Sequence, residues 1–360
     1  IYKFIYMSEK TNDEQLFELI KSYTRENKEK ELEVRFGINT STNPITRENF
    51  ENVINKFKSY GFKLLNDDGS YHLNINSEYV DSKTGLKKMS NLRTEIYGFN
   101  NIQNYCKKNS FDIENVPNYI NFSKKSRIKH DTVIGKFYDP IIYDDFQFRI
   151  NYKNEIALEP NDRFVRILLE SWNDSKKIFR FIKRYTLVHD KYPFKIDCSV
   201  VKTSKQRKNA RNNYWMVPQY NIKDSGVFDN IEHFEIELEL TKINNNNDIG
   251  RELINKYNEI YNDKSVRYLI QVLKKGIKMV MSGIQESNYP ISYKEQSNML
   301  KEYIELTYDD KKKKIKKEEL LEDRNEYRRQ NRKNFIGPSS VSLELKHIIN
   351  NEEQINILKN

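Results

Sequence analysis

The sequence predicts an α+β fold whose main part is an antiparallel β-barrel with flanking helices, followed by a basic helical linker. Between about residues 62 and 243, most segments alternate apolar and polar residues, which is typical of half-buried antiparallel strands. The segments on either side carry apolar residues at helical spacing. Two strands far apart in the sequence place glutamates on one face, and basic strands lie between them.

Helices are predicted at both edges of the alternating region. Thr11 and Glu14 are spaced as a capping box that begins a helix ending near residue 23. After a strand at 31–37, Thr46 is a predicted N-cap, and Gly61 is suited to end that second helix. Apolar spacing over 249–277 predicts one or two further helices. The predicted strands that follow residue 62 include 71–80, 91–97, 146–156, 179–188, 194–201 and 234–243.

Length, composition and charge narrow the class of protein. A chain of 360 residues can form one large domain or two modest ones. Only 37% of the residues are hydrophobic, but 24 Tyr and 19 Phe supply large buried surfaces. The net charge of +10 favours a polyanionic partner such as nucleic acid. We expect residues 1–300 to form the barrel domain and 301–334 a charged helical linker, which is either a solvated surface helix or an RNA contact.

Cysteine, histidine and hydropathy patterns exclude several classes. Cys106 and Cys198 form no CxxC pair, and the histidines have no zinc-ligand spacing. These features predict a reducing compartment and no structural zinc. The first seven residues are too short for a signal peptide, and no apolar run approaches the ~18 residues of a membrane span. We therefore expect a soluble intracellular protein with no membrane partner.

The glutamates of the two distant strands recur at every second position. Glu31, Glu33 and Arg35 share one face of the first strand, and Glu235, Glu237 and Glu239 share one face of the second. Either strand alone is explained by a polar face that meets water. Together they carry enough negative charge to require a cation or basic neighbours. Mg²⁺ and Mn²⁺ suit such carboxylates best.

Basic residues repeatedly fall on one parity of the strands between these two. Arg180 and Arg184 lie four residues apart, and Lys195 alternates with Asp197. Further members of this set are Arg93, Arg149 and Lys153, the last two in a strand that also carries Glu155. A solvated face explains any single member. Beside two acidic strands, they predict a closed barrel with a polar interior that binds a charged ligand.

The motifs ELEVRFG (31–37) and FEIELEL (234–240) resemble the paired Glu-x-Glu strands of triphosphate tunnel metalloenzymes, specifically the metal-dependent RNA triphosphatases of fungi, poxviruses and other large DNA viruses. Arg35 resembles that branch more than the thiamine-triphosphatase and adenylate-cyclase branch, which usually has lysine there. At Ile182 relatives often have a basic residue, so Lys183 or a register shift is expected to compensate. The resemblance covers about 31–243 and includes 92–96 with 102–106, Lys125 before Asp144 and Asp145, 149–155, 180–184 and 194–197.

The resemblance implies an eight-stranded tunnel barrel that hydrolyses the γ-phosphate of 5′-triphosphate RNA, the first step of mRNA 5′ capping. The resemblance thus implies a polynucleotide 5′-triphosphatase, in which Arg35 would serve either the phosphate or the glutamates. Glu155 would orient the attacking water, Asp197 would fix a neighbouring arginine or lysine, and Glu235 would support the metal site. The implied ligands of one or two Mg²⁺ or Mn²⁺ ions are Glu31, Glu33, Glu237 and Glu239, and the implied phosphate-binding residues are Arg93, Lys125, Arg149, Lys153, Arg180 and Arg184.

The segment 334–344 resembles the junction that leads into the guanylyltransferase domain of viral capping enzymes, although a turn and a helix start would also explain it. The chain contains no Lys-x-Asp-Gly motif, so guanylyl transfer is not assigned to it. We expect residues 335–360 to begin a truncated guanylyltransferase (nucleotidyltransferase) domain. The expected partners are RNA and a guanylyltransferase or methyltransferase domain or subunit, and the expected location is the host cytoplasm (viral factory) or the virion.

Two other functions remain open from the sequence. A non-catalytic barrel that binds RNA or another polyanion is disfavoured, because such a barrel has no use for inward glutamates. A tunnel-fold nucleoside triphosphatase or polyphosphatase would need the same residues, and the sequence does not separate it from an RNA triphosphatase.

Overall fold

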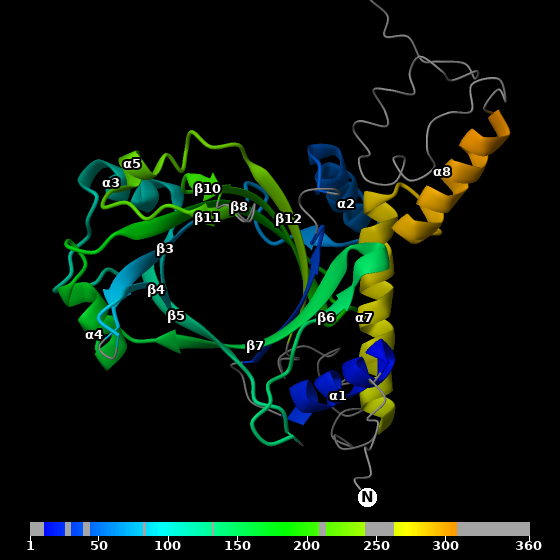
Figure 1. Cartoon of the computed structure of the whole chain (residues 1–360), viewed down its shortest axis with the longest axis horizontal. Coiled ribbons are helices and arrows are strands. Elements are labelled where there is room, and N and C mark those ends of the chain that lie inside the picture. The colour runs from blue at the N-terminus through cyan, green and yellow to red at the C-terminus, as the bar shows by residue number, and fades with distance from the viewer. Residues whose placement is uncertain are drawn as a thin grey trace, which may run out of the picture. The chain divides into compact units, whose positions relative to one another are not determined.

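Eight antiparallel strands close into a barrel in the computed structural model of this chain (Figure 1). The last strand of the series pairs with the first, which leaves the barrel without a free edge. The closed eight-stranded barrel expected from the sequence is thereby confirmed. The order around it is β1 (Lys30–Phe36), β12 (His233–Leu240), β9 (Phe194–Thr203), β8 (Lys177–Val188), β3 (Ser70–Val80), β4 (Lys87–Tyr97), β5 (Ile120–Arg127) and β7 (Phe148–Leu158).

The structure describes residues 11–25, 30–38, 44–81, 84–131, 133–208, 214–241 and 263–307. Short strands extend the sheet or stand beside it: β2 (Lys63–Leu64) pairs with β8, β6 (Ile141–Tyr143) with β7, and β10 (Gln206–Lys208) with β11 (Tyr214–Met216). The helices that belong to the same compact unit are α1 (Asn12–Arg25), α2 (Arg47–Ser59), α3 (Phe99–Lys108), α4 (Arg163–Glu170), α5 (Ile222–Ser225) and α7 (Asp263–Ile284).

The chain consists of two compact units that divide between residues 290 and 291, ten residues before the boundary expected from composition. The second unit contains α8 (Tyr293–Thr307), which overlaps the start of the expected linker. The rest of that linker and the expected domain start at 335–360 lie outside the described residues. Within the described residues, no helix is long and apolar enough to cross a membrane.

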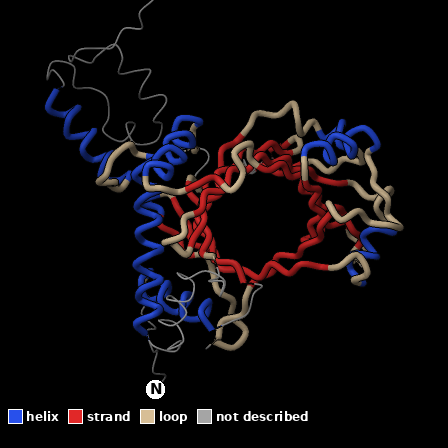
Figure 2. The backbone as a smooth tube through the Cα atoms, turned by 180° about the vertical axis from the view of Figure 1, so that it is seen from behind, coloured by secondary structure: helices blue, strands red, loops and turns tan. Residues whose placement is uncertain are grey.

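The apolar core lies outside the barrel wall, because the polar side chains of the strands point inward. Leu32, Val34 and Leu238 alternate with the glutamates of β1 and β12 and are fully buried. A second cluster, which includes Ile96, Trp172 and Phe179, packs on the far side of the barrel beside α3, α4 and α5. The ring of strands and the helices outside it can be followed in Figure 2. This inside-out arrangement keeps the interior free for a charged ligand.

Two glycines let α7 approach its neighbours closely. A Cβ atom at Gly276 would lie 2.5 Å from Leu238 Cδ1 of β12, and one at Gly283 would lie 2.8 Å from Val53 Cα of α2. Neither site has space for a larger side chain without movement of its neighbour. The close packing of α7 supports β12 from behind, and β12 carries one row of glutamates into the barrel.

Several local predictions are confirmed. The Glu14 amide donates to Thr11 Oγ1 at 3.3 Å and the Thr11 amide to Glu14 Oε2 at 2.9 Å, which completes the expected capping box. Thr46 caps α2 with Asn49 as its partner, and Gly61 adopts a φ of 87° just beyond the end of that helix. Of the helix expected over 249–277, residues 249–262 lie outside the described residues, and α7 continues to Ile284. The strand expected over 234–243 ends earlier, at Leu240.

Candidate active site

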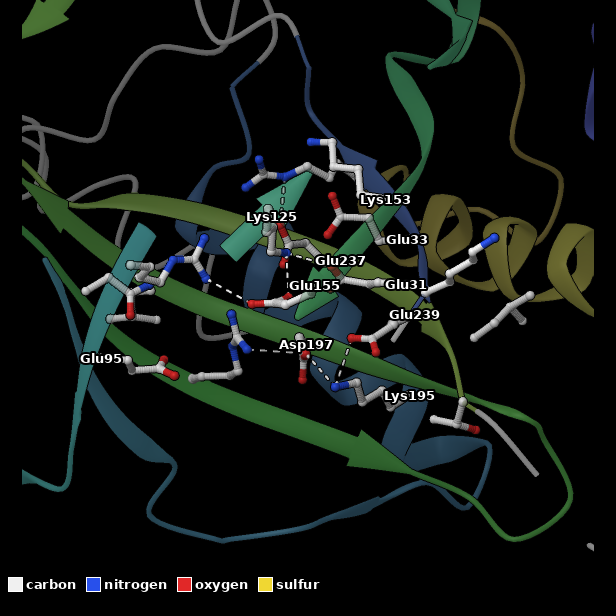
Figure 3. A pocket seen from close by; sticks show the side chains of 18 of the residues that line it. Glu31, Glu33, Glu95, Lys125, Lys153, Glu155, Lys195, Asp197, Glu237 and Glu239 are labelled. Carbon is white, nitrogen blue, oxygen red and sulfur yellow. Dashed lines mark hydrogen bonds and ion pairs between the residues drawn. The ribbon is translucent and has the colours of Figure 1, made fainter. Parts of the chain in front are cut away.

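The barrel encloses a cavity of about 580 Å³ whose lining is dominated by charged side chains (Figure 3). The carboxylates and cations that line it come from strands all around the barrel, because alternation turns one face of each strand inward. Of the residues expected from the sequence, the cavity lining contains Glu31, Glu33, Arg35, Arg93, Lys125, Lys153, Glu155, Arg180, Arg184, Asp197, Glu237 and Glu239.

The two glutamate rows form one continuous wall. β1 and β12 are neighbours in the barrel, with Glu33 directly opposite Glu239 and Arg35 directly opposite Glu237. Residues separated by about two hundred positions in the sequence therefore share the same patch of the interior. Figure 3 shows Glu31, Glu33, Glu237 and Glu239 gathered around the same space as Glu155 and Lys125.

Each glutamate of this wall contacts a basic or amide side chain. Glu33 is 7% exposed and accepts a hydrogen bond from Asn151 Nδ2. Glu235 is not among the residues that line the cavity, and both Arg35 and Arg180 contact it. The remaining contacts are Glu31 with Lys125 at 2.6 Å, Glu237 with Arg35 at 2.7 Å, Glu239 with Lys195 at 2.9 Å and Glu33 with Asn151 at 3.0 Å.

Two glutamates of the wall are harder to ionise than an ordinary glutamate despite these partners. Burial raises the pKa of Glu31 to about 7 against the lowering effect of Lys125, and the charges of Glu33 and Glu239 add to the rise. Burial also raises the pKa of Glu239, with Asp197 adding to the effect and Lys195 opposing it. A positive charge placed between these carboxylates would therefore be favourable.

Lys125 and Glu155 form a second charged group on the neighbouring strands β5 and β7. Lys125 Nζ lies 2.9 Å from Glu155 Oε2, and Arg93 Nη1 lies 3.6 Å from Glu155 Oε1. Burial alone would raise the pKa of Glu155, but the charges of Lys125 and Arg93 lower it below its ordinary value. Glu155 is thus ionised at neutral pH and can accept a hydrogen bond from a water molecule.

Asp197 contacts a basic residue of β8 and a basic residue of β9. Its Oδ2 atom lies 3.6 Å from Arg184 Nη1 and 3.5 Å from Lys195 Nζ, while Thr186 Oγ1 donates to its Oδ1 atom at 2.6 Å. Burial lowers the pKa of Arg184 but the charges of Asp197 and Glu237 raise it, with a net upward shift. Asp197 therefore contacts both a neighbouring arginine and a neighbouring lysine.

Three positions that the sequence analysis discussed are less simple: Arg149, the departure at Ile182, and Lys183 as its expected compensation. Arg149 lies opposite Arg35 in the register but outside the cavity lining, and its Nε atom is buried with no hydrogen-bond partner in the described residues. Ile182 lines the cavity between Arg180 and Arg184. Lys183 does not compensate for it, because its ammonium lies over the rings of Tyr71 and Tyr185, and β8 pairs without a register shift.

The donor set suits a hard divalent cation by residue type. Carboxylate oxygens are the ligands that Mg²⁺ and Mn²⁺ prefer. Burial raises the pKa of Glu31 and of Glu239, and a cation bound beside them would stabilise their ionised forms. As the side chains stand, no group of three or more His, Cys, Asp or Glu residues in the described ranges is arranged to hold a metal ion. Their present contacts explain this, because each carboxylate is turned to its own basic or amide partner.

The cavity also contains residues that the sequence did not single out as site members. Lys195 was recognised only as part of an alternating strand, although its inward parity with Asp197 was already visible. Asn74, Glu95 and Tyr97 belong to β3 and β4. Glu95 and Tyr97 share parity with Arg93, so the extension of that parity along the strand was the signal that would have found them.

Comparisons with known proteins give matches at the level of structure only. No protein-family model matches the chain, and no curated protein matches it. A solved structure of the mimivirus capping enzyme triphosphatase is 19% identical, covers 71% of this chain and 99% of its own, and has a TM-score of 0.42. The RNA triphosphatase domain of a trifunctional mimivirus mRNA capping enzyme is 17% identical, covers 70% of this chain and 97% of its own, and has a TM-score of 0.39.

The RNA triphosphatase Pct1 of S. pombe, solved in complex with the Spt5 CTD, is 13% identical, covers 76% of this chain and 93% of its own, and has a TM-score of 0.36. These identities and scores are low. The closed barrel of this chain is therefore established by its own strand pairing.

Proposed function

We propose that this chain is a metal-dependent hydrolase that removes the γ-phosphate from 5′-triphosphate RNA, the first step of mRNA 5′ capping. The observation that carries the proposal is the enclosed cavity in which a wall of glutamates faces a set of arginines and lysines. A triphosphate needs cationic side chains around its oxygens, and its hydrolysis needs neutralisation of charge that develops on the terminal phosphoryl group. The ELEVRFG and FEIELEL motifs, which resemble those of RNA triphosphatases, supply this wall.

Glu31, Glu33, Glu237 and Glu239 would hold one or two Mg²⁺ or Mn²⁺ ions. Bound there, the metal would polarise the terminal phosphoryl group and offset its charge. Glu235 would support this group indirectly, through its contacts with Arg35 and Arg180. The glutamates therefore have two tasks, which are to bind the cation and to hold the nearest arginines in place.

The basic residues would bind the phosphate oxygens and orient the chain of phosphates. Arg93 and Lys125 adjoin Glu155, so a phosphate held by them lies next to a carboxylate that can orient the attacking water. Arg180 and Arg184 would approach from β8, with Arg184 steadied by Asp197. Lys153 and Arg149 are assigned to the same task from β7. Fixed orientation of phosphate and water is a large part of catalysis in phosphoryl transfer.

The test is to measure phosphate release from triphosphate-ended RNA, ATP and tripolyphosphate with Mg²⁺, with Mn²⁺ and with neither. The proposal expects metal-dependent release from RNA and none with EDTA. Release from ATP or tripolyphosphate but not RNA would favour the alternative function of a nucleoside triphosphatase or polyphosphatase. Binding of RNA without release from any substrate would favour a non-catalytic RNA-binding barrel.

In the capping pathway, the diphosphate end that this reaction leaves is the substrate of a guanylyltransferase. We therefore assign the chain to a capping machinery that also includes guanylyltransferase and methyltransferase domains or subunits, with the host cytoplasm or the virion as its place of action.

A further inference from the structure

The cavity reaches one end of the barrel and stops short of the other. Because the strands are antiparallel, the end at which β1 begins is also the end at which β4 and β12 finish. Lys30, Tyr97 and Thr241 line the cavity at this end, which we call the mouth. Toward the opposite end the lining residues stop at Arg35 and Arg180, and both of these contact Glu235.

Tyr97 is the aromatic residue that the mouth presents to solvent. Its side chain lines the cavity and the residue is 37% exposed. Tyr23 also lines the cavity, but it is buried and its hydroxyl donates to the Leu240 carbonyl. Within the described residues, Tyr97 is therefore the cavity-lining aromatic whose ring is accessible to an entering molecule.

A network of polar side chains behind Tyr97 holds its ring in place. The His72 ring packs edge-on against it, with 4.6 Å between ring centroids. His72 Nδ1 lies 3.1 Å from Glu95 Oε1, and Ser70 Oγ lies 2.7 Å from His72 Nε2. Burial, together with the neighbouring Glu95 carboxylate, raises the pKa of Tyr97 to about 12, so its hydroxyl stays neutral. A ring fixed in advance loses little conformational freedom on binding.

Ser70, His72 and Glu95 have the residue types of a hydrolytic triad, but their position argues for a different task. Neither Ser70 nor His72 lines the cavity within the described residues, and Ser70 Oγ also lies 3.4 Å from the Arg184 carbonyl. A nucleophile needs space for a substrate beside it. The trio is better explained as the support of Tyr97.

The order of residues along β4 indicates what would reach Tyr97. Arg93 lies deep in the cavity beside Glu155, and Tyr97 lies four residues farther along the same strand, which is about 13 Å of extended chain. A triphosphate that enters phosphate-first and places its terminal phosphate near Arg93 would leave its nucleoside at the mouth.

We propose that Tyr97 stacks on the first nucleobase of the substrate, so that the site selects a nucleoside-linked triphosphate end over inorganic tripolyphosphate. The inference rests on the proposed function and deepens it, because it names the part of the substrate that is recognised outside the phosphates. Stacking on an aromatic face tolerates any base, as an enzyme acting on many transcripts requires. Tyr97 is a specificity residue in this scheme, and His72, Glu95 and Ser70 are positioning residues.

The test compares Tyr97→Ala and Tyr97→Phe with the parent protein, using triphosphate-ended RNA as substrate and tripolyphosphate as competitor. Loss of one stacked base predicts a roughly five- to hundred-fold rise in KM for RNA with Tyr97→Ala, with little change in kcat. The inhibition constant of tripolyphosphate should stay unchanged, since that anion lacks a base. Tyr97→Phe keeps the ring and should keep the parent KM.

Tyr79→Ala is the matched control, because Tyr79 is a comparably exposed tyrosine (46%) that does not line the tunnel cavity. An unchanged KM for RNA with Tyr97→Ala would overturn the inference. So would an equal loss of affinity for RNA and tripolyphosphate, which would point to a general disturbance of the cavity. Absence of RNA hydrolysis by the parent protein would instead count against the proposed function, so the two failures are distinguishable.

Discussion

Arg35 Nε lies 2.7 Å from Glu237 Oε1, across neighbouring strands that bring together residues from opposite ends of the barrel sequence. Arg35 also reaches Glu235 at 3.0 Å, and the residue is partly buried. From the sequence, Arg35 could serve either the phosphate or the glutamates. In the structure Arg35 contacts one candidate metal ligand, Glu237, and the neighbouring Glu235. Its contact with the phosphate stays a prediction.

Replacement of Arg35 by Gln should lower both stability and activity. Glu235 and Glu237 would keep their charges with one partner fewer, at a cost of about 1–3 kcal/mol for a pair that is only partly buried. We expect a lower midpoint in chemical denaturation and at least about a tenfold loss of phosphate release. A double-mutant cycle with Glu237→Gln measures the coupling directly. A coupling energy near zero would show that the contact between Arg35 and Glu237 does not stabilise the protein.

Removal of single carboxylates from the glutamate wall should affect activity far more than folding. Glu33→Gln and Glu237→Gln each keep the shape of the side chain and remove one carboxylate from the glutamate wall. We expect a loss of phosphate release of roughly 100-fold or more, since a preorganised charge that acts on the transition state is typically worth that much. Thermal unfolding should remain cooperative.

The control for these variants is Glu51→Gln, an exposed position on α2 outside the barrel. It should retain the parent rate and the parent Tm. Parent-like turnover by both Glu33→Gln and Glu237→Gln would refute the assignment of the glutamate wall as the metal site.

The strand periodicity made the barrel and most of its inward residues predictable, because alternation fixes which face each side chain takes. Residues such as Glu33 and Glu237 stand out since glutamate is a poor strand former. β5 was not recognised as a strand, because its sequence runs polar from Ser123 to Arg127 and shows no regular alternation. The helices α3 and α4 were missed because each is short and interrupts a region dominated by strands.

The partners of the charged residues could not be read from the sequence. Lys195 and Glu239 meet because β9 and β12 pair in one particular register, which depends on the whole barrel. The same holds for Asn151 and Glu33. Parity identifies inward residues, but only tertiary structure determines which inward residues touch, and hence which carboxylates hold raised pKa values.

A buried lysine outside the tunnel cavity should make stability depend on alkaline pH. Lys177 is 2% exposed, and its ammonium donates to the Trp172 and Ser175 carbonyls. Burial lowers its pKa to about 8, with Asp174 opposing the shift. Because this pKa is lowered, the folded state favours the neutral amine of Lys177. The resulting contribution to the free energy of unfolding is fully present above the ordinary lysine pKa and is lost as the pH falls through about 8.

The unfolding free energy of the parent protein should therefore rise relative to Lys177→Met between about pH 8 and pH 10.5, by on the order of 3 kcal/mol in total. Urea denaturation of both proteins across this range measures the difference. Lys87→Met, at an exposed lysine of β4, is the matched control. A flat difference for Lys177→Met would show that the lysine keeps its ordinary pKa.

Lys153 and Lys125 should respond differently to the same substitution, because among the described residues only Lys125 is in an ion pair. Lys125 pairs with Glu31 and Glu155, whereas Lys153 lines the cavity with no ion pair among the described residues.

Lys153→Gln should leave the Tm nearly unchanged, since no ion pair is lost. Its KM for triphosphate-ended RNA should rise about tenfold, the value of one charge-assisted hydrogen bond to a phosphate. Lys125→Gln should lower the Tm as well as the activity, because two half-buried carboxylates each lose a partner. Steady-state kinetics and thermal melts on both variants separate the cases, and a lowered Tm with unchanged KM for Lys153→Gln would reverse the assignment.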